Sequence, residues 1–341
     1  MGEARVNVGL LGVGAIGRIH ATNLAGRVQG ARLSAVADVD RAAAAACAAE
    51  FGVEAVFDGV RELVNDRRVD AVAVASPAAT HAAAIEAAAA AGKHIFCEKP
   101  LAYDLDEIDR ALRAVEKAGA KLQVGFNRRF DPGFRQAYET ARSGKLGRLY
   151  RLHIVGRDPF VERLMPKAAG ELLLETTVHD FDLARHMAGT EPLSVYAEGG
   201  AAAAAAAGMS GAAGIDTAVV VLRFPDGVIA TIDNGQTAYG YDQRLELFGS
   251  KGGFWVGNET PYRALLADGE AVRSPLPLHF FPERYAESYV AEMAAFIDCI
   301  RNDAAPQVSG RDGRAAIVLA LAAMRSLEEG RPVAVAEIAA L

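Results

Sequence analysis

The sequence predicts two domains of different architecture: an α/β domain with a doubly wound parallel sheet, then an α+β domain built on a large, mostly antiparallel open sheet. A length of 341 residues is enough for about two domains that each bury a core. The first 124 residues alternate short apolar strands with helices, whereas longer strands of alternating polarity begin near Gly125. We therefore place the two domains at residues 1–124 and 125–341.

The composition excludes several classes of protein. Hydrophobic residues make up 51% and charged residues 23% of the chain, which is the balance of a globular protein. A net charge of −7 without a dense basic patch argues against a nucleic-acid partner. No apolar run is long enough for a membrane span or a signal peptide, and the three cysteines lie far apart. We expect a cytoplasmic protein with no membrane partner and no metal site.

A glycine-rich turn follows the first predicted strand. Residues 6–11 form a continuous apolar run, typical of a strand buried on both faces, and lead into a GxGxxG pattern at residues 12–17. A helix is predicted at 16–25, and a second strand at 33–37 ends at Asp38. This order of strand, glycine turn, helix and acid is typical of a dinucleotide-binding site.

Each glycine of the turn has a separate role in such a site. Gly12 allows the tight turn, Gly14 lets the backbone approach a pyrophosphate, and Gly17 lets the helix pack closely on the strand. The carboxylate of Asp38 can accept hydrogen bonds from both ribose hydroxyls of NAD, whereas the extra phosphate of NADP would face a negative charge. We therefore expect NAD, and Arg41 is a minor argument for NADP.

Two further motifs lie at the carboxyl ends of later strands, the edge at which doubly wound sheets bind ligands. Strands are predicted at 53–57, 71–75 and 94–97, and helices at 42–50, 60–65 and 80–91. The second of these strands leads into Ser76-Pro77 and the third into Glu98-Lys99-Pro100. Taken alone, Lys99 is also consistent with a surface lysine before a proline-started helix. The predicted cofactor-binding residues are Gly12, Gly14, Ala15, Ile16, Gly17, Asp38, Ser76, Pro77, Glu98 and Lys99.

Several segments repeat the motifs of one known family, in the same order, along nearly the whole chain. They are residues 9–20, 92–102, 124–131, 175–182, 248–252, 310–313 and 330–333. On these segments the chain resembles the Gfo/Idh/MocA oxidoreductases, and within them the inositol 2-dehydrogenases. The resemblance implies a homotetramer with a Rossmann domain that uses NAD to oxidise a cyclic polyol. It implies myo-inositol as the substrate and 2-keto-myo-inositol (scyllo-inosose) as the product.

The resemblance also implies that Lys99, His179 and an acid four residues before the histidine form the reacting group. Here that acid is Glu175, where the inositol enzymes usually carry Asp, and the extra methylene bears on which substrate is held. Chemistry supports the same roles, because a neutral imidazole suits proton abstraction near pH 7 and an ammonium group stabilises a developing alkoxide. In a helix, Glu175 lies on the side of His179 and can orient it or bind an adjacent hydroxyl. Without the cofactor-binding half, His179 is also consistent with an ordinary histidine near a helix start.

The second domain is predicted to contain strands at 149–155, 194–198, 217–224, 227–235 and 244–248. Pro225-Asp226-Gly227 predicts a hairpin between the third and fourth. Because the run 218–222 is apolar throughout, we expect the outer face of the sheet to pair with another subunit; a helix of the same chain is the alternative cover. The alanine-rich stretch 201–207 is predicted as a loop, and 287–301 and 311–327 as amphipathic helices.

A set of polar and aromatic side chains are candidates for the substrate pocket, because they lie in segments that line the pocket of the similar enzymes. They are Asn127, Arg129, His153, Asp158, Thr176, Tyr239 and Tyr285. A polyol needs many directional hydrogen bonds, which this set can provide, although Arg129 and Asp158 are also consistent with surface ion pairs. Two other functions stay open: a dehydrogenase of another sugar, an aminocyclitol or a sugar derivative, and an NAD-binding regulator without catalysis.

Overall fold

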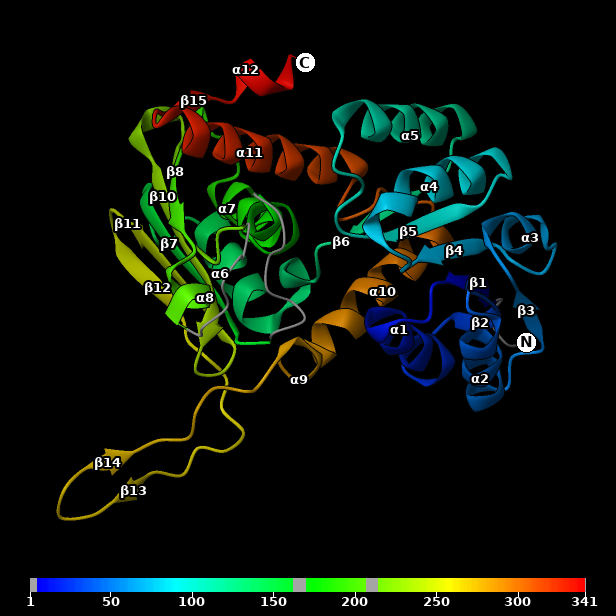
Figure 1. Ribbon diagram of the computed structural model, residues 1–341, viewed down its shortest axis with the longest axis horizontal. Coiled ribbons are helices and arrows are strands. Elements are labelled where there is room, and N and C mark those ends of the chain that lie inside the picture. Colours follow the sequence, from blue (N-terminus) through cyan, green and yellow to red (C-terminus); the bar gives the residue numbers. More distant parts are fainter. Residues whose placement is uncertain (1–4, 162–169, 207–213, 341) are drawn as a thin grey trace. The chain divides into compact units, whose positions relative to one another are not determined.

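The computed structural model describes residues 5–161, 170–206 and 214–340 (Figure 1). The chain divides into two units, and each unit is built from two segments of the sequence. The first unit consists of Met1–Phe130 and Glu287–Ile317, and the second of Asp131–Ala286 and Val318–Leu341. A single boundary between residues 124 and 125 does not describe this division, because a late segment of the chain returns to the first unit.

The first unit contains a sheet of six strands that are all parallel. The strands are β1 (Val6–Leu11), β2 (Ala31–Ala37), β3 (Ala55–Phe57), β4 (Ala71–Val74), β5 (His94–Glu98) and β6 (Leu122–Gly125). Their order is β3-β2-β1-β4-β5-β6, so the chain starts in the middle of the sheet and winds outward in both directions. This order is that of a Rossmann fold and confirms the predicted doubly wound sheet.

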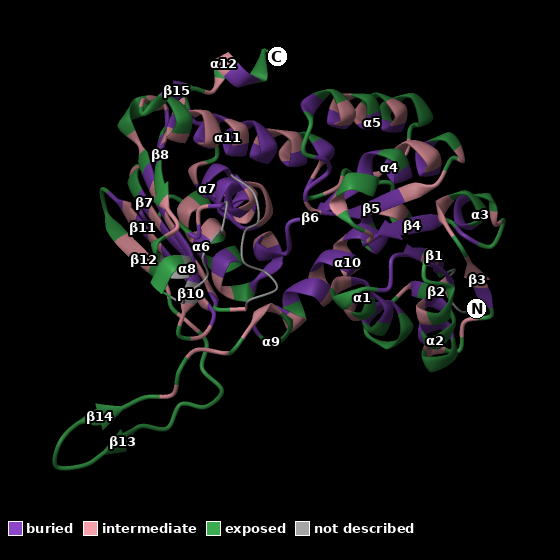
Figure 2. Cartoon of the chain, in the orientation of Figure 1, coloured by how far each residue is buried: buried purple, intermediate pink, exposed green. Residues whose placement is uncertain are grey.

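Helices bury this sheet (Figure 2). They are α1 (Ala15–Gly26), α2 (Arg41–Phe51), α3 (Val60–Asn65), α4 (His81–Ala90), α5 (Leu105–Ala118) and α10 (Ala286–Arg301), with the short turns η1 (Ala78–Thr80) and η2 (Asn127–Phe130). Helix α10 comes from late in the sequence, yet Met293 and Phe296 pack in one core with Leu10 of β1 and Leu24 of α1. That packing explains why residues 287–317 belong to the first unit.

The second unit is built on a seven-stranded sheet. Its strands are β7 (Leu149–Pro159), β8 (Ser194–Gly200), β9 (Thr217–Arg223), β10 (Ile229–Ala238), β11 (Asp242–Gly249), β12 (Gly252–Val256) and β15 (Val333–Ala334). Their order is β12-β11-β7-β10-β9-β8-β15, and every neighbouring pair is antiparallel except β7 and β10. The predicted hairpin joins β9 to β10, with Asp226 and Gly227 in the left-handed region at φ values of 61° and 79°. The mostly antiparallel sheet is therefore confirmed.

The other elements belong to the second unit, except for the first part of α11. They are α6 (Pro132–Arg142), η4 (Leu172–Thr176), α7 (Val178–Ala188), α8 (Ala202–Ala206), η5 (Pro225–Gly227), β13 (Leu266–Ala267), β14 (Val272–Arg273), α9 (Phe281–Arg284), α11 (Gly310–Glu329) and α12 (Ala336–Ala339). Helix α11 begins in the first unit and ends in the second. None of the described helices combines the length and the hydropathy needed to cross a bilayer.

The alanine-rich stretch differs from the prediction. Ala202–Ala206 form the short helix α8 rather than a loop, because alanine has the highest helix propensity and no glycine interrupts these five residues. Residue 207, the last of the predicted loop, lies outside the described residues.

One face of the second sheet carries α7. Asn234 of β10 donates a hydrogen bond to the Asp180 carboxylate of α7 at 2.8 Å, and a Cβ on Gly156 of β7 would come within 2.6 Å of the same carboxylate. Side chains alternate between faces along a strand, so Val219 and Val221 of β9 point away from α7. Val219 is 48% exposed, which places large apolar side chains on the outer face of the sheet.

Candidate active site

The glycine-rich turn between β1 and α1 gives its glycines three different environments. Gly12 has a φ of 93°, and a Cβ there would lie 2.6 Å from the carbonyl oxygen of Ala75. A Cβ on Gly17 would overlap the carbonyl oxygen of Gly12, so only glycine lets α1 approach the turn so closely. A Cβ on Gly14 would meet nothing within 4 Å. Gly14 is therefore not required by the packing of the chain, as expected if its role is to leave room for a ligand.

Backbone N–H groups at this turn are available to an anion. Gly14 is the N-cap of α1, no side chain caps that end, and the first turn carries no acidic residue. Beside it, the two carboxylate oxygens of Asp38 accept hydrogen bonds from the backbone N–H groups of Val13 at 2.8 Å and Asp40 at 2.9 Å. Each oxygen keeps a lone pair for a ribose hydroxyl. The guanidinium of Arg41 is paired with Asp58, so these residues fit NAD.

His81, which the sequence did not single out as functional, links the two later motifs of this edge. Its Nδ1 lies 2.7 Å from the carbonyl oxygen of Pro100, and its Nε2 lies 2.7 Å from the carbonyl oxygen of Ser76. Because both acceptors are carbonyl oxygens, only a ring with hydrogen on both nitrogens makes both bonds together. His81 is 1% exposed, so it is a buried bridge between the segments that follow β4 and β5.

The side chain of Glu98 points into the first unit. Its Oε1 lies 2.7 Å from Nε2 of His20, and a Cβ on Gly125 would press against its carboxylate at 3.0 Å. Glu98 is 7% exposed, whereas the next residue, Lys99, is only half-buried. The Glu-Lys-Pro segment is thus held from inside by His20 and His81, and Lys99 is its more accessible ionisable side chain.

In the second unit, Glu175, Thr176 and His179 lie on one helical segment. The turn η4 is π-helical, with the Thr177 N–H donating to the Leu172 carbonyl at 2.9 Å, and α7 follows directly. Such wide turns are frequent at functional sites. Glu175 and His179 are half-buried. Glu175 was expected to lie on the same side as His179 if both residues are helical, and both are.

The first turn of α7 is fixed by buried polar groups. Asp180 is fully buried and accepts the hydrogen bond from Asn234 described above. Asp182 is 1% exposed and lies 3.5 Å from a guanidinium nitrogen of Arg185, which also pairs with Glu191. His179 is therefore carried by a helix that is anchored to the sheet of its own unit.

Lys99 belongs to the first unit, and Glu175 and His179 belong to the second. Lys99 directly follows strand β5, Glu175 lies in η4 and His179 lies in α7. Their joint action on one substrate stays a prediction.

Two candidate substrate residues lie in η2 of the first unit. Asn127 is 2% exposed. Arg129 donates to Asp312 at 2.8 Å. Burial alone would raise the pKa of Asp312, but the charge of Arg129 and hydrogen bonds from Ser309 outweigh it and lower that pKa to about 2. Arg129 is thus engaged in an ion pair within its own unit, as the alternative of a surface ion pair allowed. Only 10% of its side chain is exposed.

The candidates of the second unit do not share one face of its sheet. His153 of β7 lies opposite Thr231 of β10, and its Nδ1 is 2.8 Å from the Thr231 hydroxyl oxygen. Thr231 is three residues before Asn234, which faces α7, so the two residues point to opposite faces of the sheet. His153 therefore points away from α7, so within one chain it does not share the α7 face with His179. Thr176 lies on the segment of His179, and Asp158 lies at the end of β7.

The two candidate tyrosines are placed differently from each other. Tyr239 is 87% exposed and lines a hollow of about 720 Å³ together with Arg157 and Asp242. Tyr285 is 1% exposed, and its hydroxyl lies 3.4 Å from the side-chain oxygen of Gln243. Burial of Tyr285 indicates a packing role, and the exposure of Tyr239 leaves it free to contact a ligand or another chain.

Comparison with known families matches both halves of the chain. Residues 6–126 match the oxidoreductase family with an NAD-binding Rossmann fold, and residues 134–255 match the GFO/IDH/MocA C-terminal domain. The chain is 41% identical to a myo-inositol 2-dehydrogenase of Thermotoga maritima, over 98% of this chain and 99% of that protein. It is 42% identical to an inositol 2-dehydrogenase of Rhizobium meliloti, over 97% of this chain and 99% of that protein.

Solved structures agree with this match. A probable dehydrogenase from Thermotoga maritima superposes with a TM-score of 0.92 at 40% identity, covering 98% of this chain and 100% of that one. A scyllo-inositol dehydrogenase from Lactobacillus casei, solved with bound NAD(H) and scyllo-inositol, superposes with a TM-score of 0.89 at 31% identity, covering 97% of this chain and 99% of that one. The chain therefore belongs to the Gfo/Idh/MocA family of oxidoreductases, with an NAD-binding Rossmann domain in its first half.

Proposed function

We propose that this protein oxidises a cyclic polyol with NAD, and that its substrate is myo-inositol, which is converted to 2-keto-myo-inositol. The observation that carries the proposal is the 41% identity, over 98% of the chain, to a relative named myo-inositol 2-dehydrogenase. The bound NAD(H) and scyllo-inositol of the Lactobacillus casei structure support the same class of cofactor and substrate. Both residues required for proton transfer and charge stabilisation, Lys99 and His179, are present.

The cofactor would be held by residues of the first unit. The uncapped N-terminus of α1 and Gly14 would receive the pyrophosphate, and Asp38 would accept hydrogen bonds from the ribose hydroxyls. Ser76 and Pro77, held in place by His81, would line the same edge. When bound, NAD supplies the nicotinamide ring that accepts the hydride.

The remaining work of the reaction falls to this chain's side chains. His179 accepts the proton of the substrate hydroxyl as a neutral imidazole. Lys99 donates a hydrogen bond to the same oxygen and stabilises the negative charge that develops there. Glu175 orients the imidazole or accepts a hydrogen bond from a neighbouring hydroxyl of the polyol. No metal ion is needed for these steps.

A substrate panel tests the proposal. Purified protein is assayed for NADH or NADPH formation with myo-inositol, scyllo-inositol, glucose and an aminocyclitol. The highest kcat/KM is expected for myo-inositol with NAD. In Lys99→Met and His179→Asn, kcat should fall by roughly 10²-fold or more, since general acid–base groups typically contribute that much. No turnover of any polyol, with NAD still bound, would identify a regulator instead.

A second candidate is the same reaction on a different sugar, an aminocyclitol or a sugar derivative. Glu175 favours it, because the inositol enzymes usually carry Asp at this position. The variant Glu175→Asp discriminates the two. If the natural substrate is myo-inositol, the variant should not raise kcat/KM for it, whereas a large gain would indicate that Glu175 selects another substrate.

We further propose that the protein is a cytoplasmic homo-oligomer, a tetramer by resemblance to its family. Val219 on the outer face of the sheet and Leu266 and Val272 on the β13–β14 hairpin are 48%, 60% and 68% exposed, which is typical of surfaces that another chain covers. Cys47, Cys97 and Cys299 are buried free thiols, as expected in a reducing compartment. Light scattering coupled to size exclusion measures the number of subunits.

A further inference from the structure

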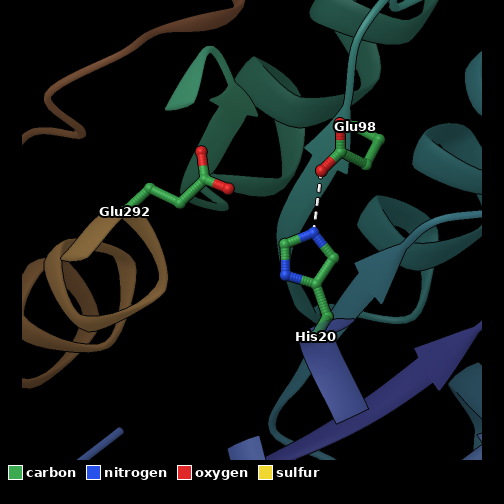
Figure 3. A group of neighbouring side chains, drawn as sticks. All are labelled: His20, Glu98 and Glu292. Carbon is green, nitrogen blue, oxygen red and sulfur yellow. Dashed lines mark hydrogen bonds and ion pairs between the residues drawn. The ribbon is translucent and has the colours of Figure 1, made fainter. Parts of the chain in front are cut away.

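A cluster of titratable side chains lies inside the first unit, beside the Glu-Lys-Pro segment. His20 from α1, Glu98 from β5 and Glu292 from α10 converge there (Figure 3), with one nitrogen or oxygen atom of each within 4.8 Å of the others. His20 and Glu292 have no exposed surface, and Glu98 is 7% exposed. Neither His20 nor Glu292 has a part in the proposed reaction, yet both lie next to the residue that precedes Lys99.

Only part of this cluster is hydrogen-bonded. Nε2 of His20 lies 2.7 Å from Oε1 of Glu98. Among the described residues, Nδ1 of His20 and both carboxyl oxygens of Glu292 have no hydrogen-bond partner. Figure 3 shows the carboxyl group of Glu292 pointing from α10 toward the other two side chains. A buried carboxylate without a partner is costly, so its protonation state must be explained by the groups that it faces.

The surroundings of Glu292 disfavour a second negative charge. The ring of His20 packs edge-on against Phe96 and Tyr289, with centroid distances of 5.1 and 5.9 Å. Cys97, which precedes Glu98 in the chain, and Tyr289, whose ring packs on His20, carry no positive charge, and Lys99 directly follows Glu98. Burial first, and the Glu98 carboxylate second, raise the pKa of Glu292 well above its ordinary value.

We propose that Glu292 is a positioning residue that acts as a neutral acid: it donates a hydrogen bond toward Nδ1 of His20 and thereby fixes the orientation of Glu98 and the backbone of Lys99. The hydrogens fit this assignment. With Nε2–H of His20 donating to Glu98, Nδ1 is an acceptor, and a protonated Glu292, whose carboxyl group lies in the same cluster, supplies the donor that it lacks. A further hydrogen bond ties α10 to β6 at this point, because the side-chain amide of Gln123 donates to the backbone carbonyl oxygen of Glu292 at 2.7 Å.

The protonation state has a test that is independent of catalysis. Urea unfolding of wild type, Glu292→Gln and the control Glu287→Gln, an exposed glutamate of the same helix, is measured from pH 5 to pH 9. A folded-state pKa above the unfolded one means that the native protein holds a proton which the unfolded chain releases. The wild-type unfolding constant should therefore rise with pH relative to Glu292→Gln, by up to tenfold per pH unit below the folded-state pKa. Parallel pH profiles for wild type and Glu292→Gln would overturn the proposal.

The positioning role has a second test, which rests on the proposed function. The amide of Glu292→Gln can still donate to His20, so its kcat should stay within about twofold of wild type. Glu292→Leu has no donor, and its kcat should fall about tenfold or more, with a smaller change in the KM for the polyol. A folded Glu292→Leu with normal kcat would show a purely structural role and overturn the proposal.

The same variants separate the neutral acid from its alternatives. Equal loss of kcat in Glu292→Gln and Glu292→Leu would mean that the ionised carboxylate is required and would overturn the proposal. So would one equivalent of zinc or manganese in the purified protein by elemental analysis, since His20, Glu98 and Glu292 also have metal-ligand spacing. If wild type oxidises no polyol, the proposed function fails, and the unfolding experiment still decides the state of Glu292.

Discussion

Replacing single glycines in the turn after β1 separates the packing of the chain from the binding of its cofactor. In Gly17→Ala, the new methyl group would overlap the carbonyl oxygen of Gly12, at a distance well under the 3.0 Å limit for real Cβ contacts. The backbone must then shift, and forced overpacking of this kind costs about 1–3 kcal/mol. In Gly14→Ala, the methyl group meets nothing within 4 Å, so the cost should be below about 1 kcal/mol.

For Gly14→Ala we expect a large loss of NAD affinity and only a small loss of stability. A methyl group at position 14 occupies the space assigned to the pyrophosphate, and NAD affinity should fall at least tenfold while the melting temperature changes little. Gly17→Ala should lower both. Thermal unfolding without cofactor and titration with NADH, followed by fluorescence, measure the two quantities. Normal NADH affinity in a folded Gly14→Ala variant would refute the assignment of this turn to the pyrophosphate.

Three further predictions concern other parts of the molecule. Asp312→Asn should cost about 2 kcal/mol of unfolding free energy at pH 7, because the pKa of Asp312 is about 2 in the folded protein and 3.8 ordinarily. This stabilisation is present above about pH 4 and is lost as the pH falls toward 2. Identical pH profiles of wild type and variant in urea unfolding would contradict it. His81→Ala removes the bridge between the segments after β4 and β5, so the KM for NAD should rise several-fold, and unchanged kinetics would show that the bridge is dispensable. Leu266→Asp with Val272→Lys should lower the number of subunits by light scattering, whereas an unchanged assembly would exclude the hairpin from the interface.

The features that the sequence predicts best are those set by neighbouring residues. The strand at 6–11 and the glycine spacing after it are local, and the φ of 93° at Gly12 and the contact of Gly17 with Gly12 are both set within the turn itself. The hairpin at Pro225-Asp226-Gly227 follows in the same way, since the turn itself requires residues that tolerate positive φ.

The features that the sequence does not reveal depend on distant partners. His20 and Glu98 are 78 positions apart, and His81 and Pro100 are 19 apart, so their hydrogen bonds leave no local pattern. The return of α10 to the first unit is likewise set by the packing of Phe296 on that core. His153 was predicted as a pocket residue from its segment alone, and the sequence did not show that its side chain faces away from α7, which the pairing of β7 with β10 determines.

The central claim is that Lys99 and His179, which stand on different units of one chain, act on the same alcohol oxygen. A crystal structure with NADH and myo-inositol tests it directly. We expect Nζ of Lys99 and a ring nitrogen of His179 within hydrogen-bond distance of one hydroxyl oxygen, on the carbon that faces the nicotinamide. A bound polyol that contacts only one of these two side chains, or neither, would contradict the proposed reaction.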